Sequence, residues 1–164
     1  MSTEILRPNG VGAVNTANIA IGAGVGEKWE QVDEAVADDA TSYLRCGSGA
    51  EAQESFALQA ESGGSGTINS VKVYFRCRNS ATASPPNGAR PGLYLAATTL
   101  MGTWVDLSNT TWFTSSEIIT RPGGGNWAWA DFANLEVVTG LKSPDGGEAN
   151  LTQIYIEIDY IWGW

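Results

Sequence analysis

The stretch Val71-Lys-Val-Tyr-Phe-Arg-Cys-Arg78 decides the fold class, because apolar and polar side chains alternate along it without a break. A period of two residues places one set of side chains on each face of a β-strand. The inward set is Val71, Val73, Phe75 and Cys77, and the outward set is Lys72, Tyr74, Arg76 and Arg78. We therefore predict a strand that is buried on one face and exposed on the other.

The same period recurs near the C-terminus, where Thr152–Trp162 places Ile154, Ile156, Ile158, Tyr160 and Trp162 on one face. Weaker strand patterns lie at 28–33, 42–46, 55–60, 92–98, 111–121 and 135–142. Turn sequences rich in glycine, proline and asparagine separate them, at 63–66, 85–88, 123–126 and 144–147. The pattern predicts an all-β protein: an antiparallel jelly-roll β-sandwich of about eight strands, with one short helix at Ala130–Leu135.

Composition agrees with one turn-rich domain. The chain has 164 residues, of which 43% are hydrophobic and only 16% charged, and it contains 20 glycines. The net charge of −9 argues against a nucleic-acid partner, since phosphate contacts need clustered Lys and Arg. No stretch approaches the roughly 20 apolar residues of a membrane span. The N-terminus lacks the pattern of a signal peptide, so we expect synthesis in a cytoplasm without classical export.

Residues 1–26 differ from the rest, because glycines alternate there with small apolar residues. Such a segment has too little side-chain volume for a core of its own. We therefore divide the chain into an N-terminal arm, 1–26, and a sandwich domain, 27–164. The arm could gain order against the body or a neighbouring subunit, or it could be a first strand followed by a loose terminus.

The absence of histidine excludes Ser-His-Asp and Cys-His triads, as well as zinc and iron sites built on histidine. The two cysteines, Cys46 and Cys77, share the parity of Leu44 and of Phe75, so both should point inward. We predict two buried free thiols, with one disulfide as the alternative.

Carboxylates suggest two further sites, each with a simpler explanation. Asp33, Asp38 and Asp39, joined by Asp159, could supply oxygen ligands to calcium, or could form a solvated acidic turn. Glu157 and Asp159 share one strand face and could serve as the acid and base of a glycosidase, or could be part of a polar outer face. We predict no enzyme, no catalytic residue, no cofactor and no metal site.

Tryptophan is abundant, with seven residues in the chain. Trp104 and Trp112 flank a loop and could form a platform for a sugar ring. Trp127 and Trp129 bracket the short helix and should plug one end of the sandwich, and Trp162 should join the core. Trp164 is expected to anchor an interface. We favour packing and interface roles over sugar binding.

Several pieces together carry a family resemblance. They are 32–34, 38–43, 56–59, 68–74, Trp127-Ala-Trp-Ala-Asp-Phe-Ala-Asn-Leu-Glu136 and Thr152-Gln-Ile-Tyr-Ile-Glu-Ile-Asp-Tyr160. Over about residues 28–162 the chain resembles jelly-roll virion structural proteins of tailed bacteriophages and prophages. The resemblance implies a structural role in the virion without catalytic residues.

From this resemblance we predict a capsid decoration (cement) protein. It would bind the major capsid protein or other virion proteins as a homotrimer and stabilise the shell. The alternative is a carbohydrate- or receptor-binding module on a tail or fibre, with a glycan as ligand. An exposed pair of tryptophans and measurable glycan affinity would distinguish this alternative.

Overall fold

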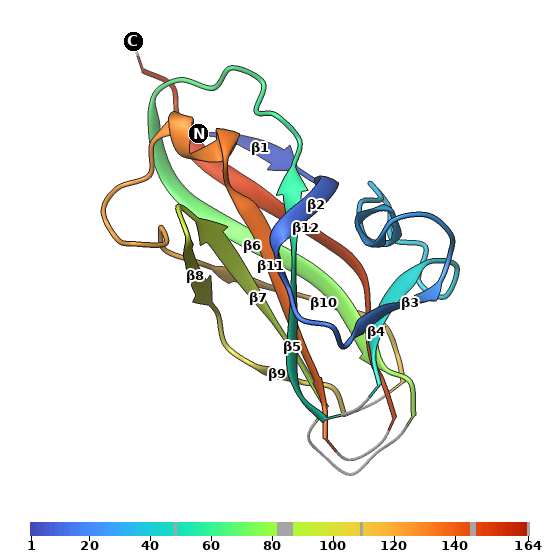
Figure 1. The fold of residues 1–164 in the computed structure, drawn as a ribbon. Coiled ribbons are helices and arrows are strands. Elements are labelled where there is room, and N and C mark those ends of the chain that lie inside the picture. Colours follow the sequence, from blue (N-terminus) through green and yellow to red (C-terminus); the bar gives the residue numbers. More distant parts are fainter. Residues whose placement is uncertain (48, 82–86, 109, 145–146, 164) are drawn as a thin grey trace.

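The computed structural model describes residues 1–47, 49–81, 87–108, 110–144 and 147–163. Within these residues the chain forms twelve strands and two short 3-10 helices, arranged as two packed antiparallel sheets (Figure 1). This confirms the predicted all-β sandwich, but the described residues form twelve strands rather than about eight, because both the N-terminal segment and the region of 88–106 contribute additional short strands. No helix in the described part of the chain is long and apolar enough to cross a membrane.

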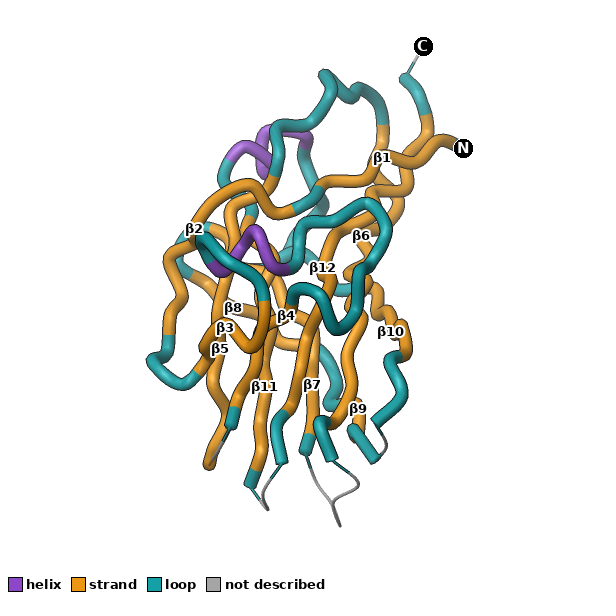
Figure 2. The backbone as a smooth tube through the Cα atoms, turned by 90° about the vertical axis from the view of Figure 1, so that its right-hand side faces the viewer, coloured by secondary structure: helices purple, strands orange, loops and turns teal. Residues whose placement is uncertain are grey.

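Sheet A contains, in order, β10 (Phe113–Ile118), β6 (Thr67–Asn79), β12 (Ala149–Ile161), β4 (Tyr43–Cys46) and β3 (Ile19–Ala23), and β1 (Ser2–Leu6) also pairs with β12. Sheet B contains, in order, β2 (Pro8–Asn15), β5 (Gly49–Leu58), β11 (Glu136–Ser143), β7 (Gly88–Leu95) and β8 (Thr98–Met101), and β9 (Val105–Asp106) also pairs with β7. The tube view shows the strands running along the length of the molecule (Figure 2). Both termini lie at the end that carries the helix η2 (Trp129–Ala133).

The core lies between the sheets and follows the predicted alternation. Val71, Val73, Phe75 and Cys77 on β6 are buried, and so are Ile154, Ile156 and Ile158 on β12. These two strands pair along nearly their whole length, which places the two most regular sequence patterns side by side in sheet A. Phe56 from sheet B and Phe132 from η2 complete the apolar interior.

Two tryptophans near η2 close one end of the core, as predicted. Trp127 stacks on Phe132 with ring centroids 5.6 Å apart. Trp129 meets the ring of Tyr160 edge-on at 4.9 Å and donates a hydrogen bond to the carbonyl oxygen of Gly66. Both side chains are partly buried against the core. The predicted interface anchor Trp164 lies outside the described residues, and so do residues 85–86 and 145–146 of the predicted turns at 85–88 and 144–147.

Three details differ from the sequence predictions. Residues 28–33 do not form a strand but contain the 3-10 helix η1 (Lys28–Gln31), where the Gln31 side chain donates to the carbonyl oxygens of Val25 and Glu27. The predicted core residue Trp162 is 53% exposed, because β12 ends at Ile161 after a register shift.

The third difference concerns the predicted arm, 1–26. Residues in this range form β1, β2 and β3, which pair with β12, β5 and β4 respectively. Leu6 and Ile19 are each only 2% exposed and belong to the core. Residue 26 is therefore not a boundary between an arm and a body, because both sheets contain strands from the N-terminal segment.

Neither cysteine forms a disulfide, and both are completely buried, as predicted. Burial raises the pKa of the Cys77 thiol to about 12, so its reactive thiolate is scarce at neutral pH. We expect a thiol reagent to label neither cysteine in the native protein and both after unfolding. Mass spectrometry with and without guanidinium would measure this, and rapid labelling of the native chain would contradict it.

Candidate functional site

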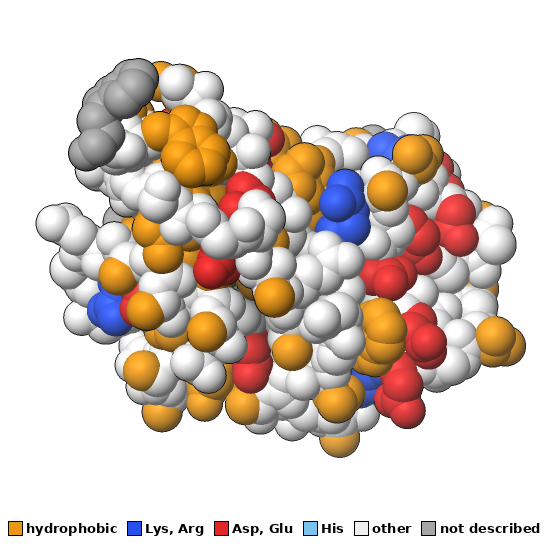
Figure 3. All heavy atoms as spheres, turned by 90° about the horizontal axis from the view of Figure 1, so that it is seen from above, with side chains coloured by type: hydrophobic (Ala, Val, Ile, Leu, Met, Phe, Trp, Pro, Cys, Tyr) orange, Lys and Arg blue, Asp and Glu red, His pale blue; other side chains and the backbone are white. Residues whose placement is uncertain are grey.

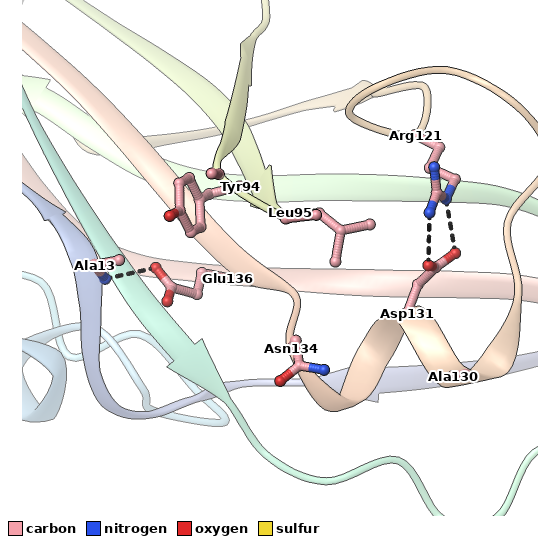
Figure 4. Close-up of a pocket in the computed structure, with 10 residues that line it drawn as sticks. Ala13, Tyr94, Leu95, Arg121, Ala130, Asp131, Asn134 and Glu136 are labelled. Atoms are coloured by element: carbon pink, nitrogen blue, oxygen red, sulfur yellow. Dashed lines mark hydrogen bonds and ion pairs between the residues drawn. The ribbon is translucent and has the colours of Figure 1, made fainter.

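A cleft of about 570 Å³ opens at one end of sheet B, beside η2 (Figure 4). Its wall contains Ala13 from β2, the turn between β7 and β8, and the side of η2. Tyr94 on β7 and Glu136 on β11 occupy paired positions in the sheet, so their side chains enter the cleft from neighbouring strands. The site is thus assembled from three stretches that are far apart in the sequence, at residue 13, 94–97 and 121–136.

Glu136 is fixed by one of its two oxygens. Its Oε2 accepts hydrogen bonds from the backbone N–H of Ala13, at 2.8 Å, and from the hydroxyl of Ser55, at 2.5 Å. Its Oε1 has no hydrogen-bond partner within the described ranges. The carboxylate therefore holds β2 against sheet B and keeps one acceptor available to a ligand.

The opposite wall is an ion pair with little freedom to move. Arg121 donates from Nε and Nη2 to the two carboxylate oxygens of Asp131, both at 2.9 Å. Its Nη1 donates to the carbonyl oxygen of Gly124, and Asp131 also accepts from the N–H of Ala128. The hydrogen bonds from Arg121 lower the pKa of Asp131. The pair is thus electrically neutral, and Glu136 is the one unpaired charge lining the cleft within the described chain.

Asn134 follows η2 and presents an exposed amide to the cleft (Figure 4). Together the cleft offers a half-buried phenol ring, an amide with both donors and an acceptor, and a carboxylate oxygen. An aromatic ring can stack on the C–H face of a small ring compound. The amide and the carboxylate can bind hydroxyl groups by several hydrogen bonds at once. Chemically, the site suits a polyhydroxylated ligand without charge.

The rim of the cleft contains a strained turn. Ala96 and Ala97 join β7 to β8 with φ of 49° and 64°, in the left-handed region. A two-residue hairpin with both residues left-handed favours Asn-Gly, because side chains with a Cβ are strained there. We expect Ala97→Gly to raise the free energy of unfolding by about 1 kcal/mol.

Thermal unfolding would measure that gain. Ala133→Gly is the matched control, because Ala133 is exposed and lies in η2, with no left-handed strain to relieve. This control should lose stability rather than gain it. A loss of stability in Ala97→Gly as well would contradict the prediction.

The structure separates Trp104 and Trp112, the two tryptophans considered for a sugar platform. Trp104 lies against sheet B, with Arg90 and Lys142 over its ring at 4.7 and 4.3 Å. Trp112 lies against sheet A, with Arg78 over its ring at 4.6 Å. The two rings therefore do not form one platform.

The residues considered for calcium are also dispersed. Asp39 forms an ion pair with Arg76, and the two hydrogen bonds measure 2.6 and 2.9 Å. Asp38 accepts hydrogen bonds from the backbone and hydroxyl of Ser42, so it shapes the turn before β4. Asp33 is half-buried, and burial raises the pKa of its carboxyl. Within the described ranges, no three acidic or cysteine side chains gather as metal ligands.

Glu157 and Asp159 lie on the outer face of sheet A, as their parity predicts. The hydroxyl of Tyr74 donates to Glu157, and the amide of Asn69 donates to Asp159. Neither carboxylate lines the cleft beside η2. Other acidic side chains gather on one side of the molecule when it is viewed from the end with the termini (Figure 3).

Sequence reasoning missed Tyr94, Asn134, Glu136 and Arg121. Tyr94 and Glu136 lie within predicted strands, but nothing local marks them as neighbours, since their proximity depends on the register between β7 and β11. The stretch Trp127–Glu136 was singled out for its resemblance, and it does supply one wall of the cleft.

Comparisons with known proteins show the fold. The CBM22-1 xylan-binding domain from Paenibacillus barcinonensis Xyn10C matches with a TM-score of 0.55 and 9% identity, over 98% of this chain and 97% of that one. An arabinose-bound α-L-arabinofuranosidase, MgGH51, matches with a TM-score of 0.55 and 11% identity, over 88% of this chain and 22% of that one. This chain thus spans about a fifth of the arabinofuranosidase.

A bacteriophage CBA120 tailspike protein 4 domain matches with a TM-score of only 0.44 and 12% identity, over 94% of this chain and 19% of that one, which is too distant to bear on function. Neither a protein-family model nor a curated protein sequence matches the chain. What these likenesses establish is a jelly-roll β-sandwich of the kind found in carbohydrate-binding modules.

Proposed function

We propose that this chain is a non-catalytic carbohydrate-binding module and that the cleft beside η2 is its glycan site. The observation that carries the proposal is the convergence of the Tyr94 ring, the Asn134 amide and the Glu136 carboxylate in one cavity. A shared fold does not establish a shared function, so the proposal is argued from the site.

The geometry fits a neutral sugar better than an anionic one. The Arg121–Asp131 pair contributes no net charge, which leaves Glu136 as the one unpaired charge among the described residues that line the site. A uronic acid or a sulfated sugar would be repelled by that carboxylate and by the net charge of −9 on the whole chain. Sugar hydroxyls, by contrast, can donate to Glu136 Oε1 and both donate to and accept from Asn134.

Two further features support the proposal. The xylan-binding domain that matches over almost its whole length shares the sandwich architecture, and its name describes binding rather than catalysis. The cleft volume of about 570 Å³ also falls within the range of small-molecule sites, which is about 300–1,000 Å³.

The test is a binding measurement on neutral oligosaccharides, with xylohexaose, cellohexaose and arabinan fragments as probes. We expect Tyr94→Ala to weaken binding of the preferred probe at least tenfold, because the stacking surface is lost. Tyr155→Ala is the matched control, since Tyr155 stacks on Tyr74 in sheet A, away from the cleft. Equal affinity of the Tyr94 variant and the wild type would overturn the proposed site.

The virion role inferred from the family resemblance is a second proposal. Its supporting observation is an apolar surface near the two termini, where Ile161 and Trp162 are about half exposed and Met1 almost fully exposed. In this proposal the surface contacts the major capsid protein, and three copies meet on the shell. A particle map would test it: isolated copies, or a buried glycan cleft with those residues in solvent, would contradict it.

A further inference from the structure

A second pocket, of about 210 Å³, lies beside the loop between β10 and η2. It is bounded by residues 68–71 at the start of β6, residues 118–121 at the end of β10, and residues 125–127. Arg121 lines both this pocket and the cleft, so the two cavities are neighbours that share one wall.

The pocket contains an aromatic ring that packs against a residue of the core. Trp127 stacks on Phe132 with an interplanar angle of 15°, and Phe132 is 2% exposed. Because its partner is part of the core, the indole is fixed before any ligand arrives. The Trp127 ring is itself half-buried, which leaves part of its surface to line the pocket. A fixed ring of this kind lowers the entropy cost of stacking.

Residues with uncharged polar side chains line the same pocket as Trp127. They are Asn69, Ser70, Thr120 and Asn126. Asn69 uses its Nδ2 to donate to Asp159, which leaves its carbonyl oxygen as an acceptor. Asn126 is exposed, and its side chain has no hydrogen-bond partner among the described residues. Both donors and acceptors are thus available.

Among the described residues, Arg121 is the one charged residue that lines the pocket, and its guanidinium is already hydrogen-bonded within the protein. The Arg121 guanidinium donates to both oxygens of Asp131 and to the carbonyl oxygen of Gly124. Three consecutive glycines, 123–125, form the loop with positive φ, and Gly125 lines the pocket without a side chain that could occupy it.

From this arrangement we infer that the Trp127 pocket is a second carbohydrate site, which binds one neutral monosaccharide unit. Its ring, two amides and two hydroxyls match the apolar face and the hydroxyl groups of a sugar. Its volume is well under half that of the cleft, so it accepts a single unit such as a chain end or a branch. Two adjacent sites on one module would bind a branched glycan bivalently, with higher avidity than either alone.

The experiment is a protein-observed NMR titration with four separate probes: D-xylose, L-arabinose, D-galactose and D-glucose. We expect at least one sugar to shift the Trp127 indole and the Asn126 side-chain amide, with a saturation curve separate from that of Asn134 in the cleft. Asn126→Ala should weaken the Trp127 response at least fivefold and leave the Asn134 response unchanged. Tyr94→Ala should weaken the Asn134 response at least fivefold and leave the Trp127 response unchanged.

The outcomes separate this inference from the proposed function. If a sugar shifts Asn134 but none of the four shifts Trp127, the second site is wrong and the cleft stands. If Trp127 responds and Asn134 does not, the second site stands and the cleft is wrong. If neither responds to any sugar, both are wrong. A Trp127 response that survives in Asn126→Ala but vanishes in Tyr94→Ala would mean one site only, and would also overturn the inference.

Discussion

A chain that lacks residues 1–26 should not fold. The deletion removes Leu6 and Ile19, each 2% exposed in the core. Truncating one such buried side chain to alanine costs about 2–5 kcal/mol, and the whole stability of a domain is about 5–15 kcal/mol. The deletion also removes one strand from sheet B and two from sheet A, so β12, β5 and β4 each lose the backbone hydrogen bonds to one partner strand. These losses together exceed the stability available.

Far-UV circular dichroism and thermal unfolding of the truncated chain would check this. We expect no cooperative transition, and aggregation through the uncovered strand edges. Val11→Ser and Val25→Ser are matched controls, because both valines lie in the same segment and are 64% and 90% exposed. They should unfold as the wild type does.

A cooperative transition in the truncated chain would contradict the prediction. It would also revive the arm predicted from the sequence, particularly if the folded fragment no longer bound virus particles.

The strands that were predicted best are those whose side chains alone determine which face is buried. In β6, Val73 and Phe75 alternate with Lys72 and Tyr74, and no other arrangement buries the first pair while exposing the charge. The same logic placed Cys46 and Leu44 inward on a strand of only four residues. Hydrophobicity thus predicts which face of a strand is buried whenever large residues lie on both faces.

The strands β1 to β3 were not predicted, because their stability comes from their partners rather than from their own sequence. Gly10 and Gly12 in β2 carry no side chain that could mark a face. A Cβ on Gly12 would collide with the Ser55 side chain and backbone. The small residues that suggested an arm instead allow β2 to lie close to β5 within sheet B.

The cleft was not predicted, because it depends on tertiary register. Tyr94 and Glu136 are paired across two strands that are 42 positions apart in the chain. No periodicity carries information about such a pairing. The tryptophans attracted attention because they are rare and large, yet Trp104 is covered by Arg90 and Lys142.

The second large effect should come from Lys28→Met, which we expect to lower the free energy of unfolding by about 3 kcal/mol at neutral pH. The partner carboxylate, Glu54, is only 2% exposed, and its Oε2 lies 2.8 Å from the ammonium of Lys28. Removing one member of a buried pair leaves an uncompensated charge and costs about 3–5 kcal/mol. We place the effect at the lower end because Lys28 itself is 24% exposed.

This loss should depend on pH. Burial raises the pKa of Glu54 above its ordinary value of 4.5, and the hydrogen bond from Lys28 offsets only part of that rise. A carboxyl whose pKa is raised by folding binds its proton more tightly in the folded state. Its ionisation therefore costs stability as the pH rises from 4.5 through the folded-state pKa. Removing Lys28 raises that pKa further, so the cost should grow.

Chemical denaturation of wild type and variant between about pH 7 and about pH 4.5 would measure the difference. We expect the deficit of Lys28→Met to be largest at neutral pH and to shrink on acidification, as Glu54 takes up its proton. The double variant Lys28→Met, Glu54→Gln removes the charge and should show no such trend. A deficit that stays constant across this range in Lys28→Met would mean that lost packing of the lysine stem, rather than the unpaired carboxylate, destabilises the fold. In that case the double variant would be no more stable than the single variant at pH 7, because the unpaired Glu54 carboxylate would not be the cause of the lost stability.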